Sequence, residues 1–214
     1  AIDPQAKGAL LGRLVTRKSE AYDLMVGDHP EKAMPILTDT LATLRAARFA
    51  AADREAALQL EMTLLNMIGD AEYETGDIAG SLPWYREQQA LTEKAMADHG
   101  ETPDWLIRKG EAMFDLSGSL GDLPGQGSEA LAAADSGIAA VRRVLDYGPD
   151  ANAEKKLVML LGQRALVLSQ MGRHAEAIEA AAQSLSIRRE LLKASPADPS
   201  RILDVAIGAN SYAG

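Results

Sequence analysis

The stretch GRHAEAIEAAAQSLSIRRELLKASP, residues 172–196, decides the fold because a weaker copy of it occurs upstream. Setting residues 129–149 (EALAAADSGIAAVRRVLDYGP) against residues 176–196 (EAIEAAAQSLSIRRELLKASP) gives identities at Glu, Ala, Ala, Ala, Arg, Leu and Pro. A unit that recurs in this way usually cannot bury its own apolar face and must stack on its neighbours. The sequence therefore predicts a repeat array.

The same repeat can be followed along the chain through a turn residue and two small residues. Each turn residue is followed five positions later by a small residue, and a second small residue lies twelve positions before the first. The turn residues are Asp28, Gly76, Gly125 and Gly172, the small residues after them are Ala33, Ser81, Ala130 and Ala177, and those before them are Ala21, Gly69, Gly118 and Ala165. This constant spacing predicts four repeats of about 48 residues each.

Within a repeat the apolar and small residues recur at helical spacing, as at Ala177, Ala181 and Ser184. Each repeat is therefore expected to be two antiparallel helices joined by the turn. The helices are predicted at about 5–26 and 30–50, 53–75 and 78–98, 104–123 and 128–146, and 152–171 and 174–194, with 199–214 as an unpaired fifth first helix. The glycine-rich residues 121–127 are expected to form a long turn. No period-two stretch predicts a strand.

This pattern resembles the tetratricopeptide repeat family, above all in MIGDAEYETGDIAGSLPWY (67–85) and ALVLSQMGRHAEAIEAAAQSL (165–185). The resemblance covers nearly the whole chain, but the family repeat is about 34 residues long. The longer helices are similar to those of kinesin light chains and of arrays in bacterial signalling proteins, including kinases. The first repeat departs from the family pattern at Arg17 and Asp28.

The predicted fold is all-α: a right-handed superhelical array of antiparallel helix hairpins, four hairpins plus a terminal helix. We expect one domain, 1–214, with repeats at about 5–51, 52–99, 103–147 and 151–195 and a partial fifth repeat at 199–214. Trp84, Tyr85 and Trp105 are expected to pack between neighbouring helices.

The resemblance implies that the first helix of each repeat lines a concave binding surface. Residues three before, one after and four after its small residue form one stripe. The candidate partner-binding residues are Lys18, Tyr22, Asn66, Asp70, Tyr73, Glu74, Asp115, Ser119, Asp122 and Ser169. The alternative is an ordinary solvated helix face. The stripe lacks the paired Lys and Asn, then Lys and Arg, with which some family members hold a C-terminal carboxylate.

The charge is unevenly distributed along the chain. Residues 61–128 contain 4 basic and 13 acidic residues, which accounts for the whole net charge of −9. A surface of one sign attracts ligands of the other sign, so we expect a basic or neutral-polar peptide partner. The alternative is that the acidic excess only keeps the array soluble. Nucleic acid is not expected as a partner, because base-stacking sites need a basic surround.

The sequence shows no catalytic motif. There is no cysteine, and His29, His99 and His174 lack a second ligand at helical spacing, so no catalytic residue, metal site or cofactor is predicted. We expect a non-catalytic protein-interaction module, the scaffold or sensory part of a larger bacterial signalling or regulatory protein. The alternative is a small-ligand or cation-binding sensor or enzyme that uses the acidic concave face.

No stretch of the given sequence predicts a membrane span or a signal peptide, and the sequence begins at Ala1 rather than Met, so we expect that a targeting or anchoring segment could have been removed. We expect a fragment of a longer protein in the cytoplasm, or outside it if that protein is membrane-anchored. Ile202, Val205, Ile207 and Tyr212 give the terminal helix an apolar side. Since no second helix covers that side, homodimerisation through it is expected.

Overall fold

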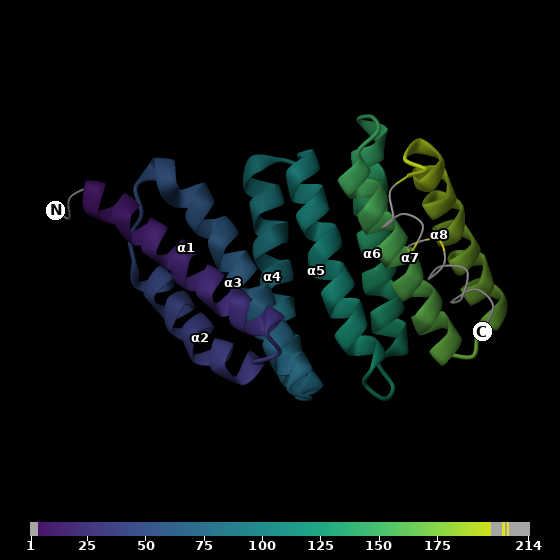
Figure 1. Cartoon of the computed structure of the whole chain (residues 1–214), viewed down its shortest axis with the longest axis horizontal. Helices are drawn as coiled ribbons and strands as arrows, with labels where there is room; N and C mark the ends of the chain where they lie inside the picture. The colour runs from purple at the N-terminus through teal and green to yellow at the C-terminus, as the bar shows by residue number, and fades with distance from the viewer. Residues whose placement is uncertain (1–3, 198–202, 204, 206–214) are drawn as a thin grey trace. The chain divides into compact units, whose positions relative to one another are not determined.

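The computed structural model describes residues 4–197, 203 and 205, and in this part of the chain helices are joined by turns and short links, with no strand (Figure 1). The elements are α1 (Pro4–Val26), α2 (Pro30–Ala46), the 3-10 helix η1 (Ala51–Asp53), α3 (Arg54–Glu74), α4 (Ile78–His99), α5 (Pro103–Gly121), α6 (Gly127–Asp146), α7 (Ala151–Gln170) and α8 (His174–Ala194). Successive α-helices pair as hairpins, which confirms the predicted helical-repeat fold.

The chain divides into two compact units, Ala1–Leu91 (unit 1) and Thr92–Gly214 (unit 2), and the boundary lies inside α4. In unit 1, α1 packs against α2, α2 against α3, and α1 also contacts α3. Unit 2 repeats this arrangement, because α5 packs against α6, α6 against α7, α7 against α8, and α5 also contacts α7. Within each unit, therefore, the first helices of successive hairpins are neighbours.

Three of the four hairpin turns share one backbone geometry. After α3, the Gly76 N–H donates to the Tyr73 carbonyl at 3.0 Å, and the Asp77 N–H donates to the Glu72 carbonyl at 2.9 Å. This pair of bonds closes a helix when the residue at its end has a positive φ, and Gly76 has φ +91°. The same bonds and a positive φ recur at Asp28 and Gly172. The spacing therefore identified the turns correctly, including the one without glycine.

The turn between α5 and α6 is longer, as predicted from its glycines and Pro124. Gly125 again has a positive φ, +80°, but three residues separate it from the end of α5, compared with one residue in the other three turns. The Gln126 N–H donates to the Leu123 carbonyl at 3.2 Å, so a separate tight turn stands between the two helices. Proline has no N–H to continue α5.

The prediction for α2 was wrong at its end, because α2 stops at Ala46 instead of residue 50. Ala47 has an extended backbone with ψ 146°, and the chain then forms η1 before α3 begins. The extended link lets Phe49 pack against the core of unit 1. Burying that aromatic ring outweighs the helical propensity of the alanines around it. The predicted helix 199–214 lies outside the described residues except for Leu203 and Val205, which are helical.

Several small residues of the repeat lie in the interior, where neighbouring helices pack against each other. Ala21, Ala33, Ser81 and Ala130 are all completely buried. At Gly69 a Cβ atom would lie 2.5 Å from Cε1 of Tyr85, so the ring of Tyr85 occupies the space that a side chain would need. Tyr85 and Trp105 are buried, and Trp84 packs against the core of unit 1, as predicted.

Candidate functional site

In unit 1 the predicted stripe lies on two neighbouring helices. On α1, Lys18 is half-buried and Tyr22 has 56% of its surface exposed. On α3, Asn66 is half-buried, whereas Tyr73 and Glu74 are exposed. Because α1 contacts α3, unit 1 offers a mixed aromatic and polar surface on its first helices.

Asp70 differs from the other stripe residues because its carboxylate is largely withdrawn from water. The Tyr85 hydroxyl of α4 donates to Oδ1 of Asp70 at 2.7 Å. Burial raises the pKa of Asp70 from 3.8 to about 6; the hydrogen bond from Tyr85 opposes the rise, and the nearby charge of Glu74 adds to it. Gly69 makes this contact possible, since a side chain there would displace the Tyr85 ring. Asp70 is therefore a packing residue of the α3–α4 pair as well as a stripe residue.

In unit 2 the predicted stripe residues differ in depth. Asp115 on α5 is half-buried, Asp122 at the end of α5 is exposed, and Ser169 on α7 is exposed. Ser119 is only 1% exposed, so it lies inside the unit beneath the stripe. The predicted residues thus form one set on α1 and α3 in unit 1 and another on α5 and α7 in unit 2.

Sequence reasoning gave too little weight to apolar residues on these first helices. Val15 and Val26 on α1 are exposed, Val26 by 70%, and with Tyr22 they recur at i, i+7 and i+11, which is one helix face. Leu166 on α7 is 50% exposed. The seven-residue spacing was visible in the sequence and indicates that these residues share one helix face, but it does not indicate that the face stays exposed.

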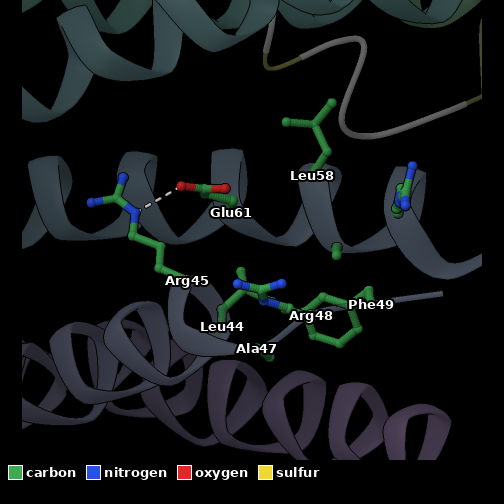
Figure 2. Close-up of a pocket in the computed structure, with 9 residues that line it drawn as sticks. Leu44, Arg45, Ala47, Arg48, Phe49, Leu58 and Glu61 are labelled. Atoms are coloured by element: carbon green, nitrogen blue, oxygen red, sulfur yellow. Dashed lines mark hydrogen bonds and ion pairs between the residues drawn. The ribbon is translucent and has the colours of Figure 1, made fainter. Parts of the chain in front are cut away.

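A second surface feature, which the sequence did not indicate, is an open cavity of about 460 Å³ where α2 leads into α3 (Figure 2). Its lining consists of Leu44, Arg45, Ala47, Arg48, Phe49, Arg54, Ala57, Leu58 and Glu61. Nε of Arg45 donates to Oε1 of Glu61 at 2.7 Å, the dashed line in Figure 2, and Nη2 of Arg45 donates to Oε1 of Glu87 at 2.7 Å. Arg45 thereby ties α2 to both α3 and α4.

Within the described residues, no group of three or more His, Cys, Asp or Glu side chains is placed to hold a metal ion. None of the described helices combines the length and the apolar character that crossing a membrane requires.

Comparison with known proteins agrees with this architecture. Residues 158–199, which include most of α7 and all of α8, match the tetratricopeptide repeat family. Among solved structures, the fold is similar to that of a Podosopora anserina protein described as a kinesin light chain with nearly identical TPR-like repeats. The TM-score is 0.63 at 16% identity, over 94% of this chain and 87% of that one. None of the curated proteins compared matches the chain. Residues 158–199 are therefore similar to a tetratricopeptide repeat, and the described residues share the helical-hairpin fold of TPR-like arrays.

Proposed function

We propose that the chain is a non-catalytic protein-interaction module that binds its partner along the first helices of its hairpins. The observation that carries this proposal is the exposure of Tyr22, Val26 and Leu166 on those helices. Tyrosine and apolar side chains that stay exposed in a folded unit are typical of the central part of protein interfaces.

The proposal also includes the chemical character of the partner and the kind of protein to which the module belongs. The acidic excess of residues 61–128 favours a basic or neutral-polar peptide segment as the partner. Asp122 and Glu74 are exposed carboxylates on the first helices and would provide that attraction. The resemblance to arrays of signalling proteins supports a scaffold or sensory role within a larger bacterial protein.

Site-specific photo-crosslinking tests this proposal directly. A photoreactive phenylalanine analogue is placed at Tyr22 or Tyr73 on first helices and, as matched controls, at the exposed alanines Ala42 of α2 and Ala139 of α6. Irradiation in cells that produce the natural protein should trap the same partner from both tyrosine positions and not from the alanines. In extracts of the same cells the crosslinking yield should fall as salt is added, because attraction between exposed charges is screened.

Equal capture from the tyrosine and alanine positions, or capture of no protein from either tyrosine, would contradict the proposal. Capture that does not change with salt would leave the interaction surface in place and exclude the basic partner.

A further inference from the structure

The cavity between α2 and α3 exists because α2 ends early. The extended link after Ala46 carries Arg48 away from the helix axis and turns Phe49 toward the core of unit 1. Figure 2 shows Arg48 and Phe49 next to each other on this link, with Glu61 on α3. Leu44 is buried at the base of the cavity, and Ala57 and Leu58 of α3 complete its apolar part. The cavity lies entirely within unit 1.

Positive charge dominates the wall of this cavity. Three arginines line it, whereas Glu61 is the one acidic residue of the lining. Glu61 is already paired with Arg45, and Arg45 is paired a second time with Glu87. Arg48 and Arg54 are exposed, and neither side chain makes a hydrogen bond or ion pair within the described part of the chain. Two guanidinium groups are therefore available beside an apolar surface.

We propose that this cavity binds an acidic residue of a peptide segment together with the apolar side chain next to it. The planar guanidinium group matches a carboxylate in shape and can donate two hydrogen bonds to it. The apolar side chain of the peptide would pack against Phe49, Ala57 and Leu58. The cavity would thus contact both the acidic residue and its apolar neighbour. This contact uses the beginning of α3, not the stripe residues Asn66, Tyr73 and Glu74 further along that helix, and it selects the opposite charge.

The charge of the whole chain favours a short acidic peptide over a polyanion. A net charge of −9 repels nucleic acid and anionic membrane surfaces at long range, whereas one or two carboxylates encounter mainly the local arginines. The apolar part of the lining argues against a free inorganic anion, which has nothing to place there.

Nuclear magnetic resonance titration of the 15N-labelled full chain tests the site with defined probes. The probes are acetyl-Glu-Phe-amide, acetyl-Gln-Phe-amide and inorganic phosphate. With the Glu probe, we expect saturable shifts of the backbone amides between residues 47 and 58 and of the Nε–H groups of Arg48 and Arg54. The Gln probe should bind at least about fivefold more weakly, because it cannot form a charge-assisted pair.

Charge-matched variants decide whether the two arginines are responsible. R48Q/R54Q should weaken binding of the Glu probe roughly tenfold, whereas R13Q/K32Q removes two exposed charges of unit 1 outside the cavity and should leave it unchanged. R48K/R54K keeps the positive charge without the planar guanidinium group, so its affinity for the Glu probe should lie between those of the native chain and R48Q/R54Q. Circular dichroism spectra should be the same for all variants.

An equal loss of affinity for the Glu probe in R48Q/R54Q and R13Q/K32Q would overturn the proposal. The absence of saturable shifts in the native chain would also overturn it. Tighter binding of phosphate than of the Glu probe at the same resonances would also overturn it, in favour of a phosphate site. Crosslinking from Tyr22 and Tyr73 should survive R48Q/R54Q, so failure of this site and failure of the proposed function can be told apart.

Discussion

Gly69 and Gly118 occupy the same position of the repeat but have different neighbours. A Cβ at Gly69 would lie 2.5 Å from the ring of Tyr85, whereas a Cβ at Gly118 would have nothing within 4 Å. Gly69→Ala should destabilise the protein by about 1–3 kcal/mol because it overpacks the α3–α4 contact. Gly118→Ala should stabilise it by about 0.5–1 kcal/mol through helical propensity alone. Urea unfolding of the two variants measures both effects, and effects of the same sign would refute the assignment.

Asp70 should make the stability of unit 1 depend on pH. Burial raises its pKa to about 6 in the folded chain, above its ordinary value of 3.8, so the folded state holds this proton more tightly. The resulting stabilisation is fully present below about pH 3.8 and is lost as pH rises through 6. A pKa difference of about 2 corresponds to about 3 kcal/mol.

Asp70→Asn should therefore stabilise the protein near pH 8 and remove this pH dependence, since Asn cannot ionise but can still accept from Tyr85. Denaturant unfolding from pH 4 to pH 8 measures the difference from the native chain. Asp23→Asn, which removes an exposed carboxylate of the same unit, is the control. The same pH dependence in the native chain and in Asp70→Asn would show that Asp70 does not cause it.

Among the elements, the hairpin turns are governed by backbone conformation. Asp28 has φ +59°, in the left-handed region that glycine adopts without steric cost, and Gly172 has φ +74° in the equivalent turn. Asp28→Gly should stabilise the first hairpin by up to about 1 kcal/mol, and Gly172→Ala should destabilise the last hairpin by about 1 kcal/mol. Thermal unfolding of both variants checks these signs. A stabilised Gly172→Ala would show that the strain is relieved elsewhere.

The helix bounds could be predicted from sequence where a turn residue marks them, as at Gly76 and Gly172. The end of α2 could not be predicted, because the alanine-rich residues 46–51 contain no helix breaker. Packing of Phe49 against the core ends the helix instead. The helices that carry the proposed stripe could be predicted from the sequence, but the burial of each stripe residue could not. Ser119 and Asp122 share a face by spacing, yet Ser119 is buried by its packing within unit 2. The arginine cavity depends on that same unpredicted link, so no local motif indicated it.

At the scale of the whole molecule, the chain consists of two units, each held together by contacts between successive helices. In repeat proteins the free energy of unfolding is approximately a sum of terms for each repeat and for each interface between neighbours. A destabilising substitution in one repeat therefore affects adjacent repeats more than distant ones. Leu65 is completely buried in the core of unit 1, and Leu65→Ala should cost about 2–5 kcal/mol. Hydrogen exchange should show the largest loss of protection in α1, α2 and α3, with α6, α7 and α8 less affected. Uniform loss over both units would indicate a single cooperative unit.

The positive φ at Asp28 also bears on how such repeats are recognised. The first turn keeps the hydrogen bonds and left-handed backbone of the turns at Gly76 and Gly172, although its residue is not glycine. The family match nevertheless extends only over residues 158–199. Residue identity and hairpin geometry thus carry separate information about repeat number. Searches that score the spacing between residues able to adopt a positive φ, Asp and Asn as well as Gly, should count repeats that identity-based profiles miss.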